Sequence, residues 1–205
     1  MLSLAGLQDA LSTPLWEVFC VALGLIVGSF ANVVIHRLPL GQSVVRPRSR
    51  CPQCGTEIRA LDNVPVLSYL LLLGRCRTCR VSISPRYPAV EAANGLLYLA
   101  IAILLGPTPH ALVAMAFVTS LLILSLIDLD HQILPDAITK TGILLGLAAS
   151  FLPGSPTPLE AVASAVGGYV ALMTLAWLAR LYYKEEALGQ GDWKIQKGQD
   201  IVLDV

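Results

Sequence analysis

Long uninterrupted apolar blocks constrain the fold of this chain more than any other feature of its sequence. They lie at about residues 15–35, 89–105, 112–127, 138–152 and 159–183. Because an α-helix rises about 1.5 Å per residue, a hydrocarbon core of about 30 Å needs roughly 20 such residues. The fourth block is short and needs flanking residues or a locally thinned bilayer to cross. We therefore predict an all-α, multi-pass membrane helix bundle.

Composition supports this class. Hydrophobic residues make up 55% of the chain, more than in a typical soluble domain, and only 14% of the residues are charged. The first block could instead belong to a cleaved leader. Residues 1–14 carry no Lys or Arg and no small-residue cleavage site ends the block, so an uncleaved helix is favoured. A shorter apolar run, Val64–Leu73, cannot cross, and we expect it to lie at the interface or to fold back.

The basic residues fall on one side of the predicted topology. The connections around 106–108 and 153–158 carry none of them, whereas Lys140 borders the turn after the third block and four others lie at or after the fifth. The positive-inside rule makes the basic side cytoplasmic and places the N-terminus outside. The remaining nine of the 14 lie between the first two blocks: Arg37, Arg46, Arg48, Arg50, Arg59, Arg75, Arg77, Arg80 and Arg86.

Two cysteine pairs lie inside this basic connection, Cys51-Pro-Gln-Cys54 and Cys76-Arg-Thr-Cys79. Each pair can wrap a turn so that both sulfurs face one point, and two such knuckles supply a tetrahedral S₄ site for zinc. Such a closed site would be structural. Redox pairs or unliganded thiols are the alternative, although a reducing cytoplasm disfavours disulfides. Cys20, inside the first block, is expected to be a small buried hydrophobe.

These features divide the chain into four parts. Residues 1–36 form the first transmembrane helix, and residues 37–88 form a cytoplasmic Cys₄ zinc-binding loop domain, a small zinc-ribbon-like insertion. Residues 89–195 contain four further spans, and residues 196–205 form an atypical polar tail. The sequence shows no internal repeat.

Acidic residues at the ends of apolar blocks are the candidates for chemistry. Asp128 directly follows an apolar run, and Asp130 and Asp136 come shortly after it. Intramembrane carboxylates cost about 2.5–3.5 kcal/mol and are functional by default. Asp136 has a structural explanation at the start of a helix, which leaves Asp128 as the strongest candidate. Asp192 follows two glycines in Gly189-Gln190-Gly191-Asp192, on the same predicted side as Asp128.

Two carboxylates brought together can perform acid–base chemistry. At about 4 Å and an effective dielectric near 20, two full charges repel by about 4 kcal/mol, so the pair tends to share one proton. The ionised member can then take a proton from water while the protonated member polarises a peptide carbonyl. Asp128 and Asp192 therefore fit aspartic proteolysis, whereas His36, His110 and His131 have no nucleophile arranged beside them.

Several stretches resemble the type IV prepilin peptidases, which are leader peptidase/N-methyltransferases of the GxGD membrane aspartyl proteases. The stretches that carry the resemblance are GLIVGSFANVVIHRLP, CPQCGTEIRALDNVPVLSYLLLLGRCRTC, ISPRYPAVEAANGLLY, LIDLDHQILPD and KEEALGQGDWK. The resemblance implies that Asp128 and Asp192 are the catalytic pair. Family members continue past the position of Lys194 with further apolar helices, so we expect this chain to be C-terminally truncated relative to them.

The resemblance also implies the substrates and the cellular location. It implies cleavage of type IV prepilins or pseudopilins, just after a glycine, on the cytoplasmic side of the bacterial inner membrane. It further implies N-methylation of the new N-terminus with S-adenosylmethionine, although no motif locates the methyltransferase residues. Substrate specificity is expected to involve the first span and acids such as Asp62 and Glu91. The expected partners are pilin substrates and the lipid bilayer, and no nucleic acid.

Two other functions fit parts of the pattern. A truncated, non-catalytic membrane scaffold of a pilus or type II secretion system would keep the zinc module without needing paired acids. An ion carrier would need a carboxylate in the middle of a span, and the acids here lie at span ends. Loss of prepilin processing in an Asp128→Asn chain that keeps its zinc would separate the peptidase from the scaffold.

Overall fold

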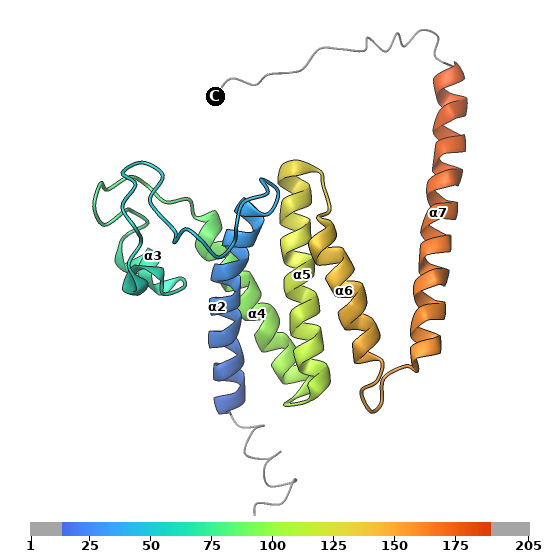
Figure 1. Cartoon of the computed structure of the whole chain (residues 1–205), viewed down its shortest axis with the longest axis horizontal. Coiled ribbons are helices and arrows are strands. Elements are labelled where there is room, and N and C mark those ends of the chain that lie inside the picture. Colours follow the sequence, from blue (N-terminus) through green and yellow to red (C-terminus); the bar gives the residue numbers. More distant parts are fainter. Residues whose placement is uncertain (1–13, 190–205) are drawn as a thin grey trace, which may run out of the picture. The chain divides into compact units, whose positions relative to one another are not determined.

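A computed structural model of the chain describes residues 14–189, with side chains placed up to residue 182 (Figure 1). The chain forms two units, which divide between Ser155 and Pro156 and are treated separately below. Over residues 14–189 the regular elements are all helices, and the β-type pairings there are isolated bridges. The all-α prediction is confirmed.

Three long helices build the first unit: α2 (Pro14–Arg37), α4 (Arg86–Leu105) and α5 (Pro109–His131). Helix α4 contacts both α2 and α5. Each of the three is long and apolar enough to cross a membrane. The turn between α4 and α5 is short because Gly106 ends one helix and the Thr108 hydroxyl caps the next.

Glycines let α2 and α4 approach closely. A β-carbon added at Gly24 would lie 2.9 Å from Cα of Gly95, and one added at Gly28 would lie 2.9 Å from Cα of Glu91. Real β-carbons do not approach backbone atoms so closely, so only glycine fits at both positions. Small residues allow the tight van der Waals packing that holds helices together in lipid.

Polar side chains connect the same three helices inside the bundle. Asn94, which is fully buried, donates from Nδ2 to the Gly24 carbonyl oxygen at 2.7 Å. The Thr119 hydroxyl donates to Oδ1 of Asn94 at 2.8 Å and lies 3.1 Å from the Tyr98 hydroxyl oxygen. These hydrogen bonds satisfy the buried amide on both sides and join α2, α4 and α5.

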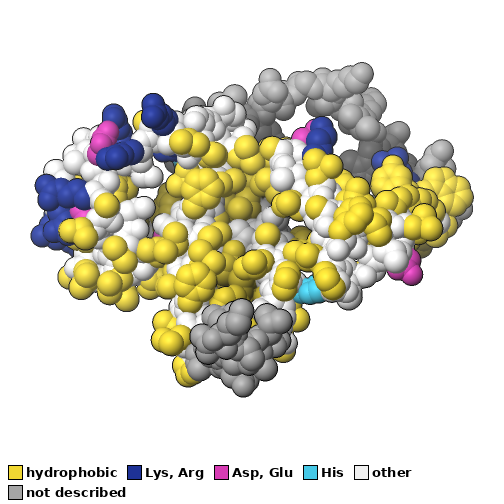
Figure 2. Space-filling view, turned by 60° about the horizontal axis from the view of Figure 1, so that its bottom comes forward, with side chains coloured by type: hydrophobic (Ala, Val, Ile, Leu, Met, Phe, Trp, Pro, Cys, Tyr) yellow, Lys and Arg dark blue, Asp and Glu magenta, His cyan; other side chains and the backbone are white. Residues whose placement is uncertain are grey.

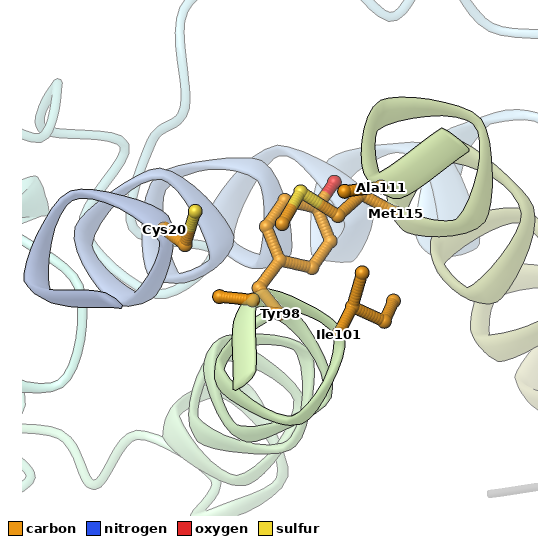
Figure 3. Close-up of a cluster of buried hydrophobic side chains, with 6 residues drawn as sticks. Cys20, Tyr98, Ile101, Ala111 and Met115 are labelled. Carbon is orange, nitrogen blue, oxygen red and sulfur yellow. The ribbon is translucent and has the colours of Figure 1, made fainter. Parts of the chain in front are cut away.

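One apolar cluster packs at the end of the bundle opposite the cysteine loop (Figure 3). It contains Tyr98, Ile101 and Met115 with smaller residues beside them. Cys20 is fully buried in this cluster, as the sequence predicts for a small hydrophobe.

The fourth apolar block forms a shorter helix than predicted. Helix α6 (Asp136–Ala149) has 14 residues, which at about 1.5 Å per residue falls well short of a hydrocarbon core of about 30 Å. Residues 150–152 turn away from the helix axis. In the second unit, α7 (Pro158–Gly189) contains a span-length segment, Pro158–Tyr182. Between residues 14 and 182, four helices rather than five therefore have the length to cross a membrane.

The outer surface of the bundle is apolar, unlike that of a soluble protein. No more than 33% of any candidate span is buried inside the structure, and large side chains such as Phe30, Leu104 and Phe117 are exposed. Figure 2 shows hydrophobic side chains over much of the visible face. This surface fits the hydrocarbon of a lipid bilayer and confirms the multi-pass membrane class.

Helices α2, α4, α5 and α6 alternate in direction (Figure 1). The loop 38–85 and the connection 132–135 consequently lie at one end of the first unit, and the connections 106–108 and 150–155 lie at the other. The arginine-rich end and the end of α5 that carries Asp128 are thus the same end, as the charge pattern predicts.

Candidate metal centre and acidic site

The loop between α2 and α4 folds around two equivalent turns, residues 49–58 and 74–83. In the first, the N–H groups of Cys51 and Gly55 donate to the carbonyls of Thr56 and Cys51 at 3.0 and 2.9 Å. In the second, the N–H groups of Cys76 and Arg80 donate to Val81 and Cys76 at 2.8 and 3.0 Å.

The two turns are related by a constant shift of 25 positions. The β-bridge Arg50↔Glu57 in the first turn corresponds to Arg75↔Ser82 in the second. The hydrogen bond from the Ile58 N–H to the Ser49 carbonyl likewise corresponds to the one from the Ile83 N–H to the Gly74 carbonyl. The expectation that the chain has no internal repeat is therefore wrong. Besides the cysteines, the two copies share only one arginine and one isoleucine, so the repeat lies in the backbone more than in side-chain identity.

The four sulfurs converge on one point. The Sγ atoms of Cys51, Cys54, Cys76 and Cys79 all lie within 4.8 Å of one another, and those of Cys51 and Cys79 are 3.7 Å apart. A tetrahedral zinc centre with Zn–S bonds of about 2.3 Å has S···S edges of about 3.8 Å. The donor set and its spacing therefore fit a structural Cys₄ metal site, as the sequence predicts.

The pKa values of the thiols differ because their neighbours differ. The Thr56 hydroxyl and backbone lower the pKa of Cys54 to about 6. Backbone N–H groups of Cys79 and Thr78 lower the pKa of Cys76. The N–H of Val81 favours the Cys79 thiolate, but desolvation and the three neighbouring sulfurs outweigh it and raise the pKa of Cys79 to about 11. Clustered thiolates repel one another, and a divalent cation removes that repulsion.

Asp62, expected to contribute to substrate specificity, forms an ion pair within the cysteine loop, and its role in specificity stays a prediction. Its carboxylate accepts from Nε of Arg77 at 2.9 and 3.0 Å and from an Nη of Arg77 at 2.6 Å. Arg77 thereby holds the pKa of Asp62 below its usual range. The pair joins the short 3₁₀ helix η1 (Ala60–Asn63) to the second knuckle.

Asp128 lies in the last turn of α5 and is exposed. The preceding residue, Ile127, is fully buried and packs in a cluster with Ala31, Ile35 and Val90. The α5 turn is therefore anchored on the bundle while its carboxylate points outward from the core. The Asp128 carbonyl accepts the N–H of Gln132 at 2.8 Å, which closes the helix.

The neighbouring acids have partners. Asp130 binds the guanidinium of Arg86 at 2.6 and 2.9 Å, and Asp136, the first residue of α6, pairs with Lys140 one turn later. Within residues 14–182, by contrast, no ion pair or side-chain hydrogen bond involves the Asp128 carboxylate. Asp192, its predicted partner, lies outside the described residues, so the pairing of the two acids stays a prediction.

Helix α4 carries two buried polar residues, of which the sequence analysis above names only Glu91. Glu91, expected to contribute to specificity, is 9% exposed and accepts the Val66 N–H at 2.7 Å. Asn94 is the second, and it is fully buried. Both are polar residues inside an apolar block, and that pattern alone could have marked them as interhelical contacts.

Comparison with known proteins supports a single family. Residues 22–105 match the model of the bacterial peptidase A24 N-terminal domain, and residues 115–198 match that of the type IV leader peptidase family. The first match contains all four cysteines of the knuckles, and the second contains Asp128 and Asp192. No solved structure gives a significant match.

Curated relatives cover most of this chain. Proteins named prepilin leader peptidase/N-methyltransferase are 46% identical in Myxococcus xanthus, 45% in Pseudomonas putida and 42% in Klebsiella pneumoniae. The alignments cover 87%, 84% and 88% of this chain, and 53%, 68% and 82% of the respective relatives. The chain thus spans about half the length of the Myxococcus protein. Relatives at this level of identity and the two family models show that the chain belongs to the type IV leader peptidase family.

Proposed function

We propose that this chain is an aspartyl endopeptidase of the bacterial inner membrane that removes leader peptides from type IV prepilins or pseudopilins. One observation carries the proposal: at the arginine-rich end of the bundle, Asp128 is the acid without a partner among residues 14–182. Arg86 neutralises Asp130, so the proton-transfer role falls to Asp128. The relatives named as prepilin leader peptidases support the substrate class.

The proposed mechanism needs a second carboxylate, which we assign to Asp192. One ionised acid of the pair takes a proton from a bound water, and that water attacks the scissile carbonyl. The other acid donates its proton to the carbonyl oxygen as charge develops there. As the C–N bond breaks, the protonated acid donates its proton to the leaving nitrogen, and the ionised acid takes a proton from a hydroxyl of the tetrahedral intermediate, which restores the starting protonation state.

The cytoplasmic side is the proposed location of cleavage. Nine of the 14 basic residues belong to the segment 37–86, at the same end of the first unit as Asp128. Arginines and lysines concentrate on the cytoplasmic side of bacterial inner-membrane proteins. A prepilin would then meet the acids at the level where its leader joins the membrane-spanning part.

N-methylation of the new N-terminal amine is the second proposed step. The relatives carry this activity in their names, and S-adenosylmethionine is the proposed methyl donor. The methyl group passes from the donor sulfonium to the amine nitrogen, and the amine loses a proton. No residue is assigned to this step.

A structural zinc ion is proposed for the four cysteines. Its sulfur ligands fill the tetrahedron, so no position is open for substrate or water. Zinc would stabilise a loop that has little apolar core of its own, with a contribution on the order of 10 kcal/mol.

Co-expression with a type IV prepilin in cells that lack another leader peptidase tests the proposal. The full chain should convert prepilin to the mature form, and the variants Asp128→Asn and Asp192→Asn should each lower conversion at least 100-fold with zinc content unchanged. Asp136→Asn is the matched control, because that acid already has a partner in Lys140. Absence of processing by the unaltered chain would refute the peptidase and favour a scaffold.

A further inference from the structure

The cysteine loop carries an apolar segment that the rest of the described chain, residues 14–182, leaves uncovered. Helix α3 (Leu67–Leu71) and its flanks carry five exposed leucines, called the leucine ridge below. The exposed fractions reach 82% at Leu61 and Leu73 and 75% at Leu71. Exposed apolar ridges of this kind mark interaction sites. The ridge consists of Leu61, Leu67, Leu70, Leu71 and Leu73.

The ridge lies beside the membrane spans rather than beyond them. In Figure 1, α3 is drawn at a level between the two ends of α2, below the end from which the loop leaves. The Val66 N–H, at the start of α3, donates to the Glu91 carboxylate at 2.7 Å, and Glu91 lies in the second turn of the span α4. A short segment tied to that turn is at the depth of a lipid leaflet, not of the cytoplasm.

The backbone of the segment is prepared for an environment without water. The N–H groups of Leu70, Leu72 and Leu73 donate to Val66, Ser68 and Leu70 at 3.1, 2.9 and 3.1 Å. The Ser68 hydroxyl donates to the Val64 carbonyl at 2.6 Å. Irregular backbone is tolerated in hydrocarbon only when its polar groups are paired in this way. Glu91 supplies an acceptor to the Val66 N–H, which directly precedes α3 and would otherwise need water.

Charges border the ridge on both sides. Arg59 and Arg75 flank it in sequence and are exposed, and its one internal acid, Asp62, is paired with Arg77. Figure 2 shows dark blue basic side chains on one side of the module and hydrophobic side chains on the other. Apolar residues with arginines at their border match acyl chains next to anionic phospholipid headgroups.

We infer that Leu61–Leu73 is a monotopic membrane element, inserted into the same leaflet as the arginine-rich ends of the spans. Glu91 fixes its depth through the Val66 N–H. The lipid of that leaflet covers the leucine ridge, and the zinc module is thereby held against the membrane at the end of the bundle that carries Asp128.

Depth-dependent fluorescence on the full chain in lipid nanodiscs tests this inference. A fluorescent amino acid is incorporated by codon suppression at Leu71 or Leu73, because a cysteine label would react with the zinc ligands. The nanodiscs contain phosphatidylglycerol and brominated phosphatidylcholine, whose bromines quench probes in the acyl region. Phe30, exposed on α2, is the control in the span, and Val45, 76% exposed beside Arg46, is the control in water.

The expected result is bromine quenching at positions 71 and 73 at least half as strong as at position 30 and at least fivefold stronger than at position 45. Quenching at the level of position 45, with iodide quenching intact, would place the ridge in water and overturn the inference. Protection from both bromine and iodide would also overturn it, because a protein surface, such as a second copy, would then cover the leucines.

A second pair of variants tests the role of Glu91. Glu91→Gln keeps an oxygen that can accept the Val66 N–H, whereas Glu91→Leu removes it. Bromine quenching at position 71 should be kept in Glu91→Gln and fall at least twofold in Glu91→Leu, with zinc stoichiometry unchanged in both. Equal quenching in the two variants would refute the assignment of Glu91 as the residue that fixes the depth.

Discussion

Arg86 and Asp130 join the first turn of α4 to the last turn of α5 through two parallel hydrogen bonds, 2.9 and 2.6 Å long, across 44 positions of the sequence. The guanidinium meets the carboxylate in the bidentate geometry that gives the strongest surface pairs. The pair holds the end of α5 that presents Asp128, two residues before Asp130. The pair neutralises Asp130, whereas the Asp128 carboxylate has no cationic partner among residues 14–182.

A double-mutant cycle should detect this pair. Arg86→Met and Asp130→Asn should each destabilise the bundle by about 1 kcal/mol, with a coupling energy of about 0.5–1 kcal/mol, because the pair is half-exposed but bidentate. Thermal unfolding of the single and double variants in detergent measures the coupling energy. The pair of Asp136 and Lys140 is the control: its side chains are 77% and 72% exposed, so its coupling should be smaller. Equal coupling energies in the two cycles would contradict the prediction that bidentate geometry and lower exposure make the Arg86–Asp130 pair the stronger one.

Removal of one sulfur should remove the metal. Cys54→Ser is expected to lower bound zinc from about one ion per chain to less than about a tenth, because a structural site needs all four ligands. Elemental analysis of the purified chain measures the stoichiometry. Cys20→Ser is the matched control, since this cysteine is buried in α2 away from the loop and should leave zinc unchanged. Zinc retained by Cys54→Ser would show that the knuckles do not form the site.

Alkylation of the metal-free chain should show the lowered pKa of Cys54. A lowered pKa means that the thiolate forms as pH rises through about 6, so the reaction of Cys54 with iodoacetamide should reach half its maximal rate near that pH. Thr56→Val should move the midpoint upward toward an ordinary thiol, because the Thr56 hydroxyl is the main cause of the shift.

Thr78→Val provides the control for this titration. Thr78 acts on Cys76 through its backbone N–H, which the substitution keeps. The alkylation midpoint of Cys76, followed by mass spectrometry, should therefore not change. A midpoint for Cys54 that is the same in Thr56→Val as in the unaltered chain would refute the assigned cause.

The glycine contact between α2 and α4 should tolerate no side chain. Gly28→Ala is expected to cost about 1–3 kcal/mol of bundle stability, because the new methyl group would lie 2.9 Å from Cα of Glu91 and would force the helices apart. Gly146→Ala, in α6, is the control because nothing lies within 4 Å of its added β-carbon. That change should be neutral or stabilising by up to about 1 kcal/mol. Unfolding in mixed detergent micelles compares the two, and an equal cost would contradict the packing.

The repeat within the cysteine loop predicts an asymmetry between its two turns. Gly55 and Arg80 are equivalent positions, and both have positive φ, +69° and +63°. Glycine adopts this conformation freely, whereas arginine is strained by about 1 kcal/mol or more. Arg80→Gly should therefore strengthen zinc retention about fivefold in a chelator competition. Gly55→Arg should weaken it by a similar factor, and a weaker site in Arg80→Gly would contradict the repeat.

Patterns local in the sequence were sufficient for several conclusions. Apolar blocks indicate membrane helices because side chains that face lipid must be apolar whatever their neighbours are. The CxxC spacing predicts the sulfur cluster because each pair needs only one turn. The same reasoning makes Asp128 a candidate catalytic acid, and that role stays a prediction. The family resemblance rests on contiguous stretches too, and the comparisons confirm it.

Other properties depend on contacts between segments that are distant in sequence. Several contacts appear only when the chain is folded. They are the ion pairs Asp62–Arg77 and Arg86–Asp130, the hydrogen bond from the Val66 N–H to Glu91, and the 25-position shift that relates the two knuckles. The sequence by itself determined the class of the protein and its candidate residues, since those depend on single helices and turns. Only the tertiary structure decided which charges are neutralised and which acid at the arginine-rich end of the bundle has no partner among residues 14–182. A side chain's partner is set by the packing of helices that the sequence does not place side by side.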